Sequence, residues 1–113
     1  MHEYSIVASL VDRAQREADT HPGAVIKKLQ VQIGELAGVE LELLRTAFET
    51  FRARSACEQA ELAIEPVPAE WRCAVCDRVL EPGAILRCCG KPAKLAAGGD
   101  IILERIEMEV RDV

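Results

Sequence analysis

The chain has 113 residues, about half of them apolar, and a formal net charge of −5. This length allows one compact domain, or one domain with a small insert, and its core has to be aliphatic because aromatic residues are few. The acidic balance and the scattered basic residues argue against nucleic-acid binding. No segment approaches the roughly 20 continuous apolar residues of a membrane helix, so we expect no membrane partner either.

The N-terminus and the cysteines together predict a cytoplasmic protein that binds metal. The N-terminus has no basic region, apolar stretch or cleavage site of a signal peptide. In the reducing cytoplasm thiols stay reduced, and five cysteines suit a disulfide framework poorly. Cys57 stands apart and is expected to be a semi-buried apolar residue. The other four are crowded as metal ligands often are, at Cys73, Cys76, Cys88 and Cys89.

Hydrophobic periodicity predicts two amphipathic helices and three strands. In chain order these are a helix over 3–18, a strand over 25–33, a helix over 39–54, a strand over 61–66 and a strand over 100–110. In the last strand we expect one set of side chains to share the core face, interrupted by Glu104. This set comprises Ile102, Ile106, Met108 and Val110.

This order of elements predicts an α+β fold in which two helices pack on one face of a three-stranded sheet. Residues 71–95 are different, because they have no sustained period and are rich in Cys, Gly and Pro. They are typical of a small zinc-ribbon-like module inserted before the last strand. We therefore expect an α+β domain made of residues 1–69 and 97–113, and a cysteine module made of residues 70–96.

The cysteine module presents two half-sites for a metal. Cys73 and Cys76 form a C-x-x-C pair, whose thiolates can reach one tetrahedral ion from a single tight loop. Cys88 and Cys89 form the second half-site, followed by Gly90, which suits a turn with positive φ. Adjacent side chains point opposite ways in extended backbone, so two neighbouring ligands require an unusual turn. A four-thiolate zinc site is the favoured interpretation, with a C-x-x-C redox pair and idle thiols as alternatives.

The first three residues can offer a different kind of metal site. A terminal amine at Met1, the following amide nitrogens and the imidazole of His2 supply four nitrogens in a plane, which Ni(II) and Cu(II) favour and tetrahedral Zn(II) does not. By itself this pattern is weak, because a histidine at the second position is usually only solvated. The other histidine, His21, is expected to interact with the last carbonyls of the first helix.

Several short motifs together resemble one family. They are Met1-His2-Glu3 at the start, the segment 34–39 (Gly-Glu-Leu-Ala-Gly-Val), Leu44 to Phe48 in the second helix, and the Cys73/Cys76 pair with Cys89-Gly90. In combination and order they resemble the HypA/HybF family of nickel chaperones for [NiFe]-hydrogenase maturation, over nearly the whole chain.

The resemblance implies a nickel metallochaperone, not an enzyme. His2 would be the essential nickel ligand, assisted by the Met1 amine and the backbone nitrogens of His2 and Glu3, which makes the α+β part the nickel-binding domain. The cysteines would hold a structural zinc. The implied partners are a nickel-delivery GTPase and the hydrogenase large subunit, with urease as a client in some organisms. We expect a monomer or a weak homodimer.

One departure from the family pattern concerns the second half-site, which in the family is also C-x-x-C-G. If Gly90 aligns, Cys89 takes the place of the fourth ligand and Leu86 stands where the third should be. Alternatively, two residues have been lost between the third and fourth ligands. The hypothesis adopted is that Cys88 and Cys89 both bind. The competing function is a zinc-ribbon interaction module that carries no nickel.

Overall fold

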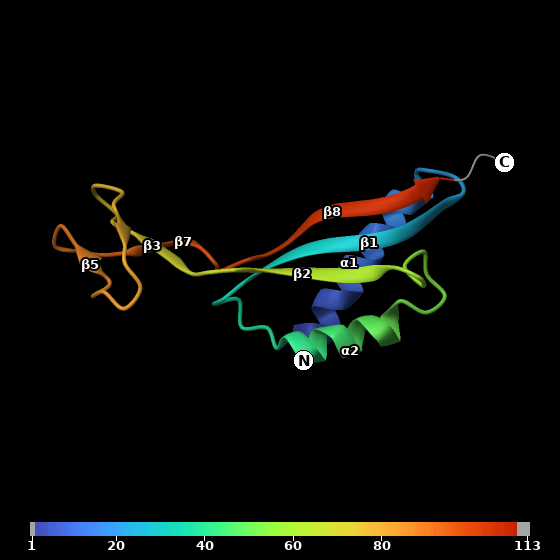
Figure 1. Ribbon diagram of the computed structural model, residues 1–113, viewed down its shortest axis with the longest axis horizontal. Coiled ribbons are helices and arrows are strands. Elements are labelled where there is room, and N and C mark those ends of the chain that lie inside the picture. Colours follow the sequence, from blue (N-terminus) through green and yellow to red (C-terminus); the bar gives the residue numbers. More distant parts are fainter. Residues whose placement is uncertain (1, 111–113) are drawn as a thin grey trace.

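The computed structural model describes residues 2–110. The molecule is elongated, with extents of 62 × 28 × 16 Å. Figure 1 shows the reason: a body of helices and long strands lies at one end, and the cysteine module lies at the other. Two extended segments, before β3 (Glu70–Arg72) and after β7 (Lys94–Ala97), connect them.

The body contains the five elements that periodicity predicted. They are α1 (His2–Asp19), β1 (Ala24–Gly34), α2 (Leu41–Phe51), β2 (Glu61–Val67) and β8 (Ile101–Val110). The prediction for α2 was too long at both ends. Glu40 has extended backbone (φ −88°, ψ 113°) and therefore precedes the helix. Arg54 has a φ of 61°, which lies outside the helical region and prevents continuation.

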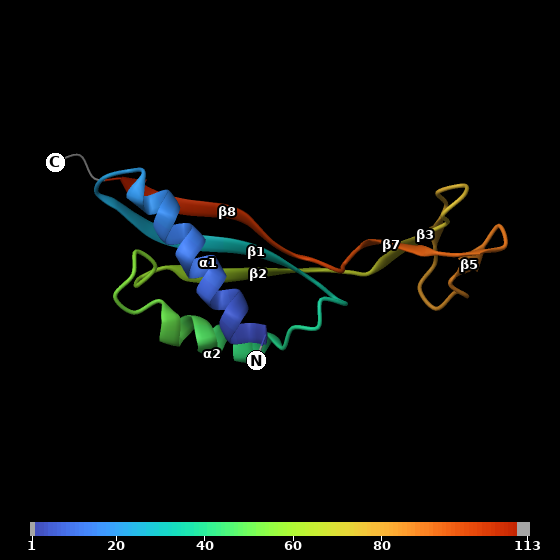
Figure 2. The same ribbon diagram turned by 180° about the vertical axis from the view of Figure 1, so that it is seen from behind.

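The sheet of the body is mixed, with strand order β2-β1-β8. β1 pairs with β2 in parallel, across the connection that contains α2, and with β8 in antiparallel. Both helices lie on the same side of this sheet, as Figures 1 and 2 show from opposite directions. The core between them is aliphatic apart from Phe48. The predicted α+β fold is therefore confirmed.

The face assignment within β8 was partly wrong. Ile106 and Met108 pack against the core as predicted, whereas Val110, at the end of the strand, is 49% exposed. Ile102 is also 49% exposed, and its neighbours Ile101 and Leu103 pack against the core instead. The cause is a β-bulge: Gln30 pairs with Arg105 and the next residue, Val31, pairs with Leu103, so Glu104 is skipped. An extra residue reverses which side chains face the core.

The cysteine module contains short strands that periodicity did not reveal. β3 is central in a sheet with β4 (Val79–Leu80) and β7, and β5 (Arg87–Cys88) forms a hairpin with β6 (Lys91–Pro92). Strands of two to four residues contain too few side chains to show an alternation. The module is thus a pair of β-hairpins and their connections, not a loop.

Where body and module meet, two glycines allow the chain segments to approach closely. A Cβ on Gly34 would lie 2.2 Å from the carbonyl carbon of Gly98, and Gly98 itself has a φ of 88°. Leu36 N–H donates to the Gly98 carbonyl (2.8 Å). The Glu35 carboxylate accepts a hydrogen bond from Ala69 N–H (3.0 Å). The segment after β1 therefore holds both connections to the module.

Candidate metal centres

The first pair of cysteines lies in the tight turn of the β3–β4 hairpin. Cys73 N–H donates to the carbonyl of Arg78 (2.9 Å), and Asp77 N–H donates to the carbonyl of Cys73 (3.1 Å), which closes the loop. Within it, Val75 N–H and Cys76 N–H both donate to the Sγ of Cys73, at 3.3 and 3.4 Å. The C-x-x-C spacing thus directs backbone N–H groups at a sulfur atom, which stabilises its thiolate form.

The second pair lies in the turn between β5 and β6. Arg87 pairs with Pro92 and Cys88 with Lys91, so Cys89 and Gly90 form a two-residue loop. Both have positive φ, at 53° and 73°, as in a type I′ hairpin turn. This is the unusual turn that neighbouring ligands require. Because Cys89 leaves the extended region, its side chain turns to the side of Cys88, and the two Sγ atoms lie 3.9 Å apart.

The structure brings all four sulfur atoms together. The Sγ atoms of Cys73, Cys76, Cys88 and Cys89 lie within 4.8 Å of one another. A tetrahedral zinc with Zn–S bonds of about 2.3 Å separates its sulfurs by about 3.8 Å, so the cluster fits zinc with only small adjustments. Leu86, the alternative occupant of the third position, is 44% exposed and offers no ligand atom.

The pKa values of the thiols also suit a cation at the centre. Hydrogen bonds from the N–H groups of Cys76 and Val75 lower the pKa of Cys73 to about 6. Hydrogen bonding to Cys73, followed by that to Cys88, raises the pKa of Cys89 to about 12. Without a cation, neighbouring thiolates repel one another and one keeps its proton. A bound metal removes that conflict, because it neutralises the charge and expels the remaining protons.

The geometry favours a metal over the two alternatives for the cysteines. A redox C-x-x-C precedes a helix, whereas Cys73 and Cys76 lie between two strands. Idle thiols would not converge on one point from two separate hairpins. Among the residues whose side chains are described, no other cluster of ligand-bearing side chains could hold a metal. Cys57 is fully buried in the core of the body and takes no part.

The proposed nickel site is at the start of α1, in the body, whereas the cysteine module lies beyond the two connecting segments (Figure 2). Met1 lies outside the described residues, and so does the side chain of His2. His2 and Glu3 open α1. Helical hydrogen bonding does not use the N–H groups of a first turn. His21, in contrast, lies beyond the other end of α1, where its Nδ1 is 3.1 Å from the carbonyl oxygen of Glu17, as predicted.

Sequence reasoning missed the role of the Glu3 side chain. Glu3 is only 6% exposed, and its carboxylate accepts a hydrogen bond from Glu40 N–H (3.2 Å). This bond, followed by one from its own backbone N–H, lowers the pKa of Glu3. Glu40 is the N-cap of α2 and provides no side-chain cap of its own. The sequence did contain a signal for this contact. The second helix begins without Ser, Thr, Asp or Asn, so its N-terminus needs a cap from another part of the chain.

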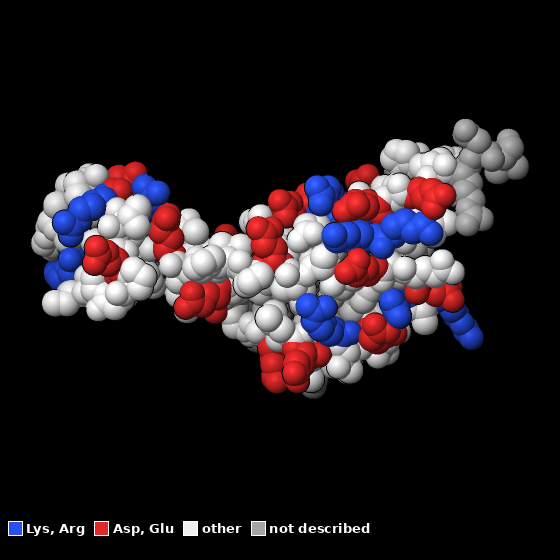
Figure 3. All heavy atoms as spheres, in the orientation of Figure 1, with Lys and Arg blue, Asp and Glu red and all other residues white. Residues whose placement is uncertain are grey.

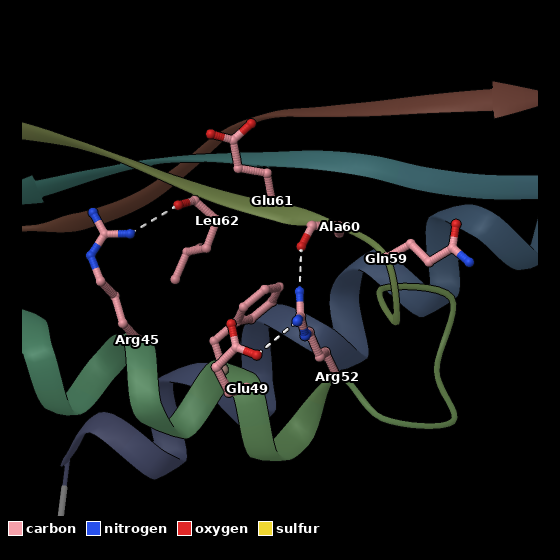
Figure 4. A pocket seen from close by; sticks show the side chains of 8 residues that line it. Arg45, Glu49, Arg52, Gln59, Ala60, Glu61 and Leu62 are labelled. Atoms are coloured by element: carbon pink, nitrogen blue, oxygen red, sulfur yellow. Dashed lines mark hydrogen bonds and ion pairs between the residues drawn. The ribbon is translucent and has the colours of Figure 1, made fainter.

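A hollow of about 420 Å³ lies between α2 and β2, and two arginines that line it are bound to the protein itself. Figure 4 shows the guanidiniums of Arg45, on α2, and of Arg52, directly after α2, pointing to the backbone at the edge strand. Arg45 donates to the carbonyl of Leu62 (3.3 Å) and Arg52 to that of Ala60 (3.0 Å). Arg52 also pairs with Glu49 at 2.7 Å. These arginines cover the carbonyl of Leu62 in β2 and that of Ala60 just before it, which otherwise could pair with another strand.

With this geometry established, comparison with known proteins decides the family. A family model described as hydrogenase/urease nickel incorporation, metallochaperone, hypA, matches residues 1–108. The chain belongs to the HypA family. The resemblance noted from the motifs is thereby confirmed. Metallochaperones bind and transfer a metal and catalyse no reaction, so a member of this family is not an enzyme.

Relatives of the HypA family match over their full length. The hydrogenase maturation factor HypA of Wolinella succinogenes is 36% identical, with 99% of this chain and 98% of that protein aligned. That of Campylobacter jejuni is 35% identical, covering 96% of this chain and all of the relative. The solution structure of the Ni metallochaperone HypA from Helicobacter pylori superimposes with a TM-score of 0.73, at 31% identity and 96% and 98% coverage.

A second HypA solution structure superimposes with a TM-score of 0.81, at 32% identity and 98% coverage of both chains. Both of these HypA structures therefore match the body and the cysteine module of this chain together. Within residues 2–110, no helix is long and apolar enough to cross a membrane.

Proposed function

We propose that this chain binds Ni(II) at its N-terminus and delivers it during [NiFe]-hydrogenase maturation, while the cysteine module holds a structural zinc. One observation carries the proposal: the HypA model matches from residue 1, so the match includes Met1-His2-Glu3. The members named for hydrogenase maturation and for nickel are similar along the whole chain, which supports the same cargo and the same process here.

In this proposal the nickel ligands are nitrogens alone. The Met1 amine, the amide nitrogens of His2 and Glu3 and the His2 imidazole surround the ion in a plane, an arrangement that Ni(II) favours. The amides must lose their protons to bind, so nickel uptake should strengthen as pH rises. The Glu3 carboxylate, which is engaged at the N-terminus of α2, acts on the position of the site and not as a ligand.

The proposed zinc ligands are Cys73, Cys76, Cys88 and Cys89. Zinc has no redox chemistry of its own and prefers four thiolates in structural sites. Its role here is to join the β3–β4 hairpin to the β5–β6 hairpin, which are connected by few other contacts. The proposed division of the chain follows: residues 1–69 and 97–113 bind nickel, and residues 70–96 fold around zinc.

The proposed partners are those of the family's process. A nickel-delivery GTPase would receive or assist transfer of the ion, and the hydrogenase large subunit would be the final acceptor; a urease is the alternative client. We propose a cytoplasmic location, where the thiols stay reduced, and a monomer or a weak homodimer. Neither nucleic acid nor a membrane is part of the proposal.

The deciding experiment compares His2→Ala with His21→Ala, since the chain has only two histidines. The parent protein and His21→Ala should each take up one Ni(II), measured by titration calorimetry and elemental analysis, whereas His2→Ala should take up none. Zinc content should be equal in all three, because the two sites share no ligand. A tag fused before Met1 should also abolish uptake, since it converts the amine to an amide.

If His2→Ala binds nickel as well as the parent does, the nickel-delivery proposal fails. The chain would then be a zinc-ribbon interaction module without nickel function.

A further inference from the structure

The cysteine module carries several large apolar side chains that are exposed to solvent. Five of its aliphatic side chains are at least 37% exposed, and Ile85, at 83%, is the most exposed large hydrophobic residue among those described. The set comprises Val75, Val79, Ile85, Leu86 and Leu95. Apolar side chains that gather on a surface, with charged residues around them, mark sites of protein interaction.

Part of this surface is hollowed into a groove. Between β4 and the segment 81–87 lies a hollow of about 520 Å³. Leu80, which is 7% exposed, is its most buried lining residue, and Ile85 is its most exposed apolar one. We call it the module groove; its lining residues are Arg78, Val79, Leu80, Glu81, Ala84, Ile85 and Arg87. Its lining therefore combines four aliphatic side chains with three charged ones: Arg78 and Arg87 near the two ends, and Glu81 between them.

The charges of the module distinguish it from the body. Residues 70–96 contain five basic and three acidic residues, whereas the rest of the chain contains nine basic and sixteen acidic ones. Glu70 and Asp77 both pair with Arg72. No ion pair among the described residues uses the other basic side chains of the module, which are Arg78, Arg87, Lys91 and Lys94. On the face that Figure 3 shows, the module carries Lys and Arg side chains together with a few acidic ones, apart from the charged side chains of the body.

We propose that the module groove binds an acidic segment of a partner protein through one apolar side chain and its flanking carboxylates. The apolar side chain would fill the hollow over Leu80 and against Ile85, which removes apolar surface from water on both partners. The carboxylates would pair with Arg78 and Arg87, whose planar guanidiniums suit bidentate contacts. The acidic body repels such a segment, so the charge distribution directs it to the module.

A protein segment fits this groove better than a nucleic acid does. Phosphate binding needs basic residues, but it gains nothing from an exposed Ile85 or Val79. Single-stranded nucleic acids need aromatic side chains for stacking, and Trp71, the only Trp of the chain, does not line the groove. The proposal goes beyond nickel delivery and does not depend on it, because no proposed nickel ligand lies in the module.

The test uses the full-length zinc-loaded protein and a display library of random short peptides. The peptides recovered should contain a Leu, Ile, Met or Phe flanked by Asp or Glu. For a recovered peptide made synthetically, Ile85→Asp and Arg78→Glu should each weaken binding by roughly tenfold or more. The same changes on the body, Ile102→Asp and Arg105→Glu, should leave it unchanged. Both controls start from exposed side chains on β8.

Each other result overturns the proposal, provided that zinc content and circular dichroism are equal in all variants. Recovery of peptides without acidic residues, or equal losses in the groove and control variants, would do so. Arg78-dependent binding of a labelled DNA oligonucleotide would identify a nucleic-acid surface. Self-association in sedimentation experiments that Arg78→Glu abolishes would identify a second copy of the chain as the occupant.

Discussion

At the scale of single residues, the two neighbouring cysteines show how one dihedral angle changes what a sequence can bind. In an extended strand, Cys88 and Cys89 would point to opposite faces. The positive φ of Cys89 places its sulfur 3.9 Å from that of Cys88, about the separation that tetrahedral zinc requires. In the proposed zinc site, the type I′ hairpin would thus let two adjacent residues replace the C-x-x-C of the family pattern.

We predict that Cys88→Ser and Cys89→Ser each weaken zinc retention. Each removes one of four thiolates, and serine is a far poorer zinc ligand at neutral pH. Chelator competition should show faster zinc loss from both variants than from the parent, and Cys57→Ser should retain zinc as the parent does. A normal rate for Cys88→Ser would leave Cys89 as the only ligand of the second hairpin.

The buried carboxylate of Glu3 leads to a prediction about the start of α2. Glu3→Ala removes the acceptor for Glu40 N–H and leaves the positive end of α2 without its cap, whereas Glu3→Gln keeps an oxygen acceptor. Thermal unfolding should therefore occur at a lower temperature in Glu3→Ala than in Glu3→Gln, and Glu3→Gln should bind nickel nearly as the parent does. Glu42→Ala is the matched control, because it removes an exposed acid from the first turn of α2 itself.

A higher unfolding temperature in Glu3→Ala than in Glu3→Gln would contradict the capping role, because the variant that keeps an acceptor would then be the less stable one. Equal unfolding temperatures in parent and Glu3→Ala would show that Glu40 N–H finds another acceptor.

The buried thiol of Cys57 predicts a loss of stability at alkaline pH. Burial raises the pKa of Cys57 in the folded protein, while in the unfolded chain the thiol ionises near its ordinary pKa of about 8.5. Above that pH the unfolded state binds fewer protons than the folded state, so the free energy of unfolding falls as pH rises. Urea unfolding at about pH 7 and about pH 9.5 should show a smaller decrease for Cys57→Ala than for the parent. Parallel decreases would contradict this assignment.

At the scale of elements, periodicity predicted what is regular and long. The two helices and three long strands follow from spacing alone, because each buries one stripe or one face. The core-facing side chains of β8 that precede Glu104 could not be predicted, since a bulge depends on the pairing with β1 and not on the composition of β8. The hydrogen bond between Glu3 and Glu40 spans 37 positions and depends on the packing of two helices. Spacing in the sequence carries no signal for such contacts.

The edge of β2 shows a second feature that only the assembled elements reveal. Arg45 lies on α2 and Arg52 directly follows α2, and both look like ordinary surface residues in the sequence. In the structure they donate to carbonyls of Ala60 and Leu62 on the open edge of the sheet (Figure 4). An edge strand whose carbonyls already have donors is a poor template for aggregation.

The close approach of two glycines predicts which substitution would disturb the junction between body and module. A Cβ on Gly98 would lie 2.6 Å from the Cα of Ala69 and 2.7 Å from the Pro68 carbonyl oxygen, both in the backbone. Gly98→Ala should therefore lower the free energy of unfolding by roughly 1–3 kcal/mol more than a glycine substitution in open space. Gly38→Ala is the matched control, because Gly38 also has positive φ but a Cβ there contacts nothing within 4 Å.

Both variants place an alanine in the left-handed region, which destabilises each by roughly 1–2 kcal/mol. The difference between their free energies of unfolding in urea therefore measures the steric clash at Gly98 alone. Equal losses would show that the junction relaxes to accept the methyl group.

At the scale of the whole molecule, the two ends are stabilised by different means. The body buries a cluster of aliphatic side chains between its helices and its sheet. In the module only Leu80 and Cys73 are buried, which is far too little apolar surface to fold 27 residues (70–96) without help. This contrast could be predicted from the sequence, because the module lacks apolar periodicity and contains the crowded cysteines. The short strands could not, because tight turns, such as the one at Cys89 and Gly90, define them and not apolar spacing.

This contrast predicts that removal of zinc unfolds the module alone. The single Trp, Trp71, lies in β3 of the module, and the single Tyr, Tyr4, lies in α1 of the body, where its ring contacts that of Phe51 with centroids 6.0 Å apart. The two chromophores therefore report on the two ends separately. A strong zinc chelator should shift Trp71 emission toward that of a solvated indole and make residues 70–96 sensitive to protease. The far-UV signal of the helices should persist, because the body has its own core.

Cys73→Ala should reproduce these changes without a chelator, since it removes the sulfur atom on which two backbone N–H groups converge. Added zinc should reverse the effect of the chelator in the parent but not in this variant. Loss of the helical signal together with the Trp71 shift would mean that body and module unfold as one unit. The division at residues 70 and 96 would then be wrong, because zinc binding would stabilise the whole chain.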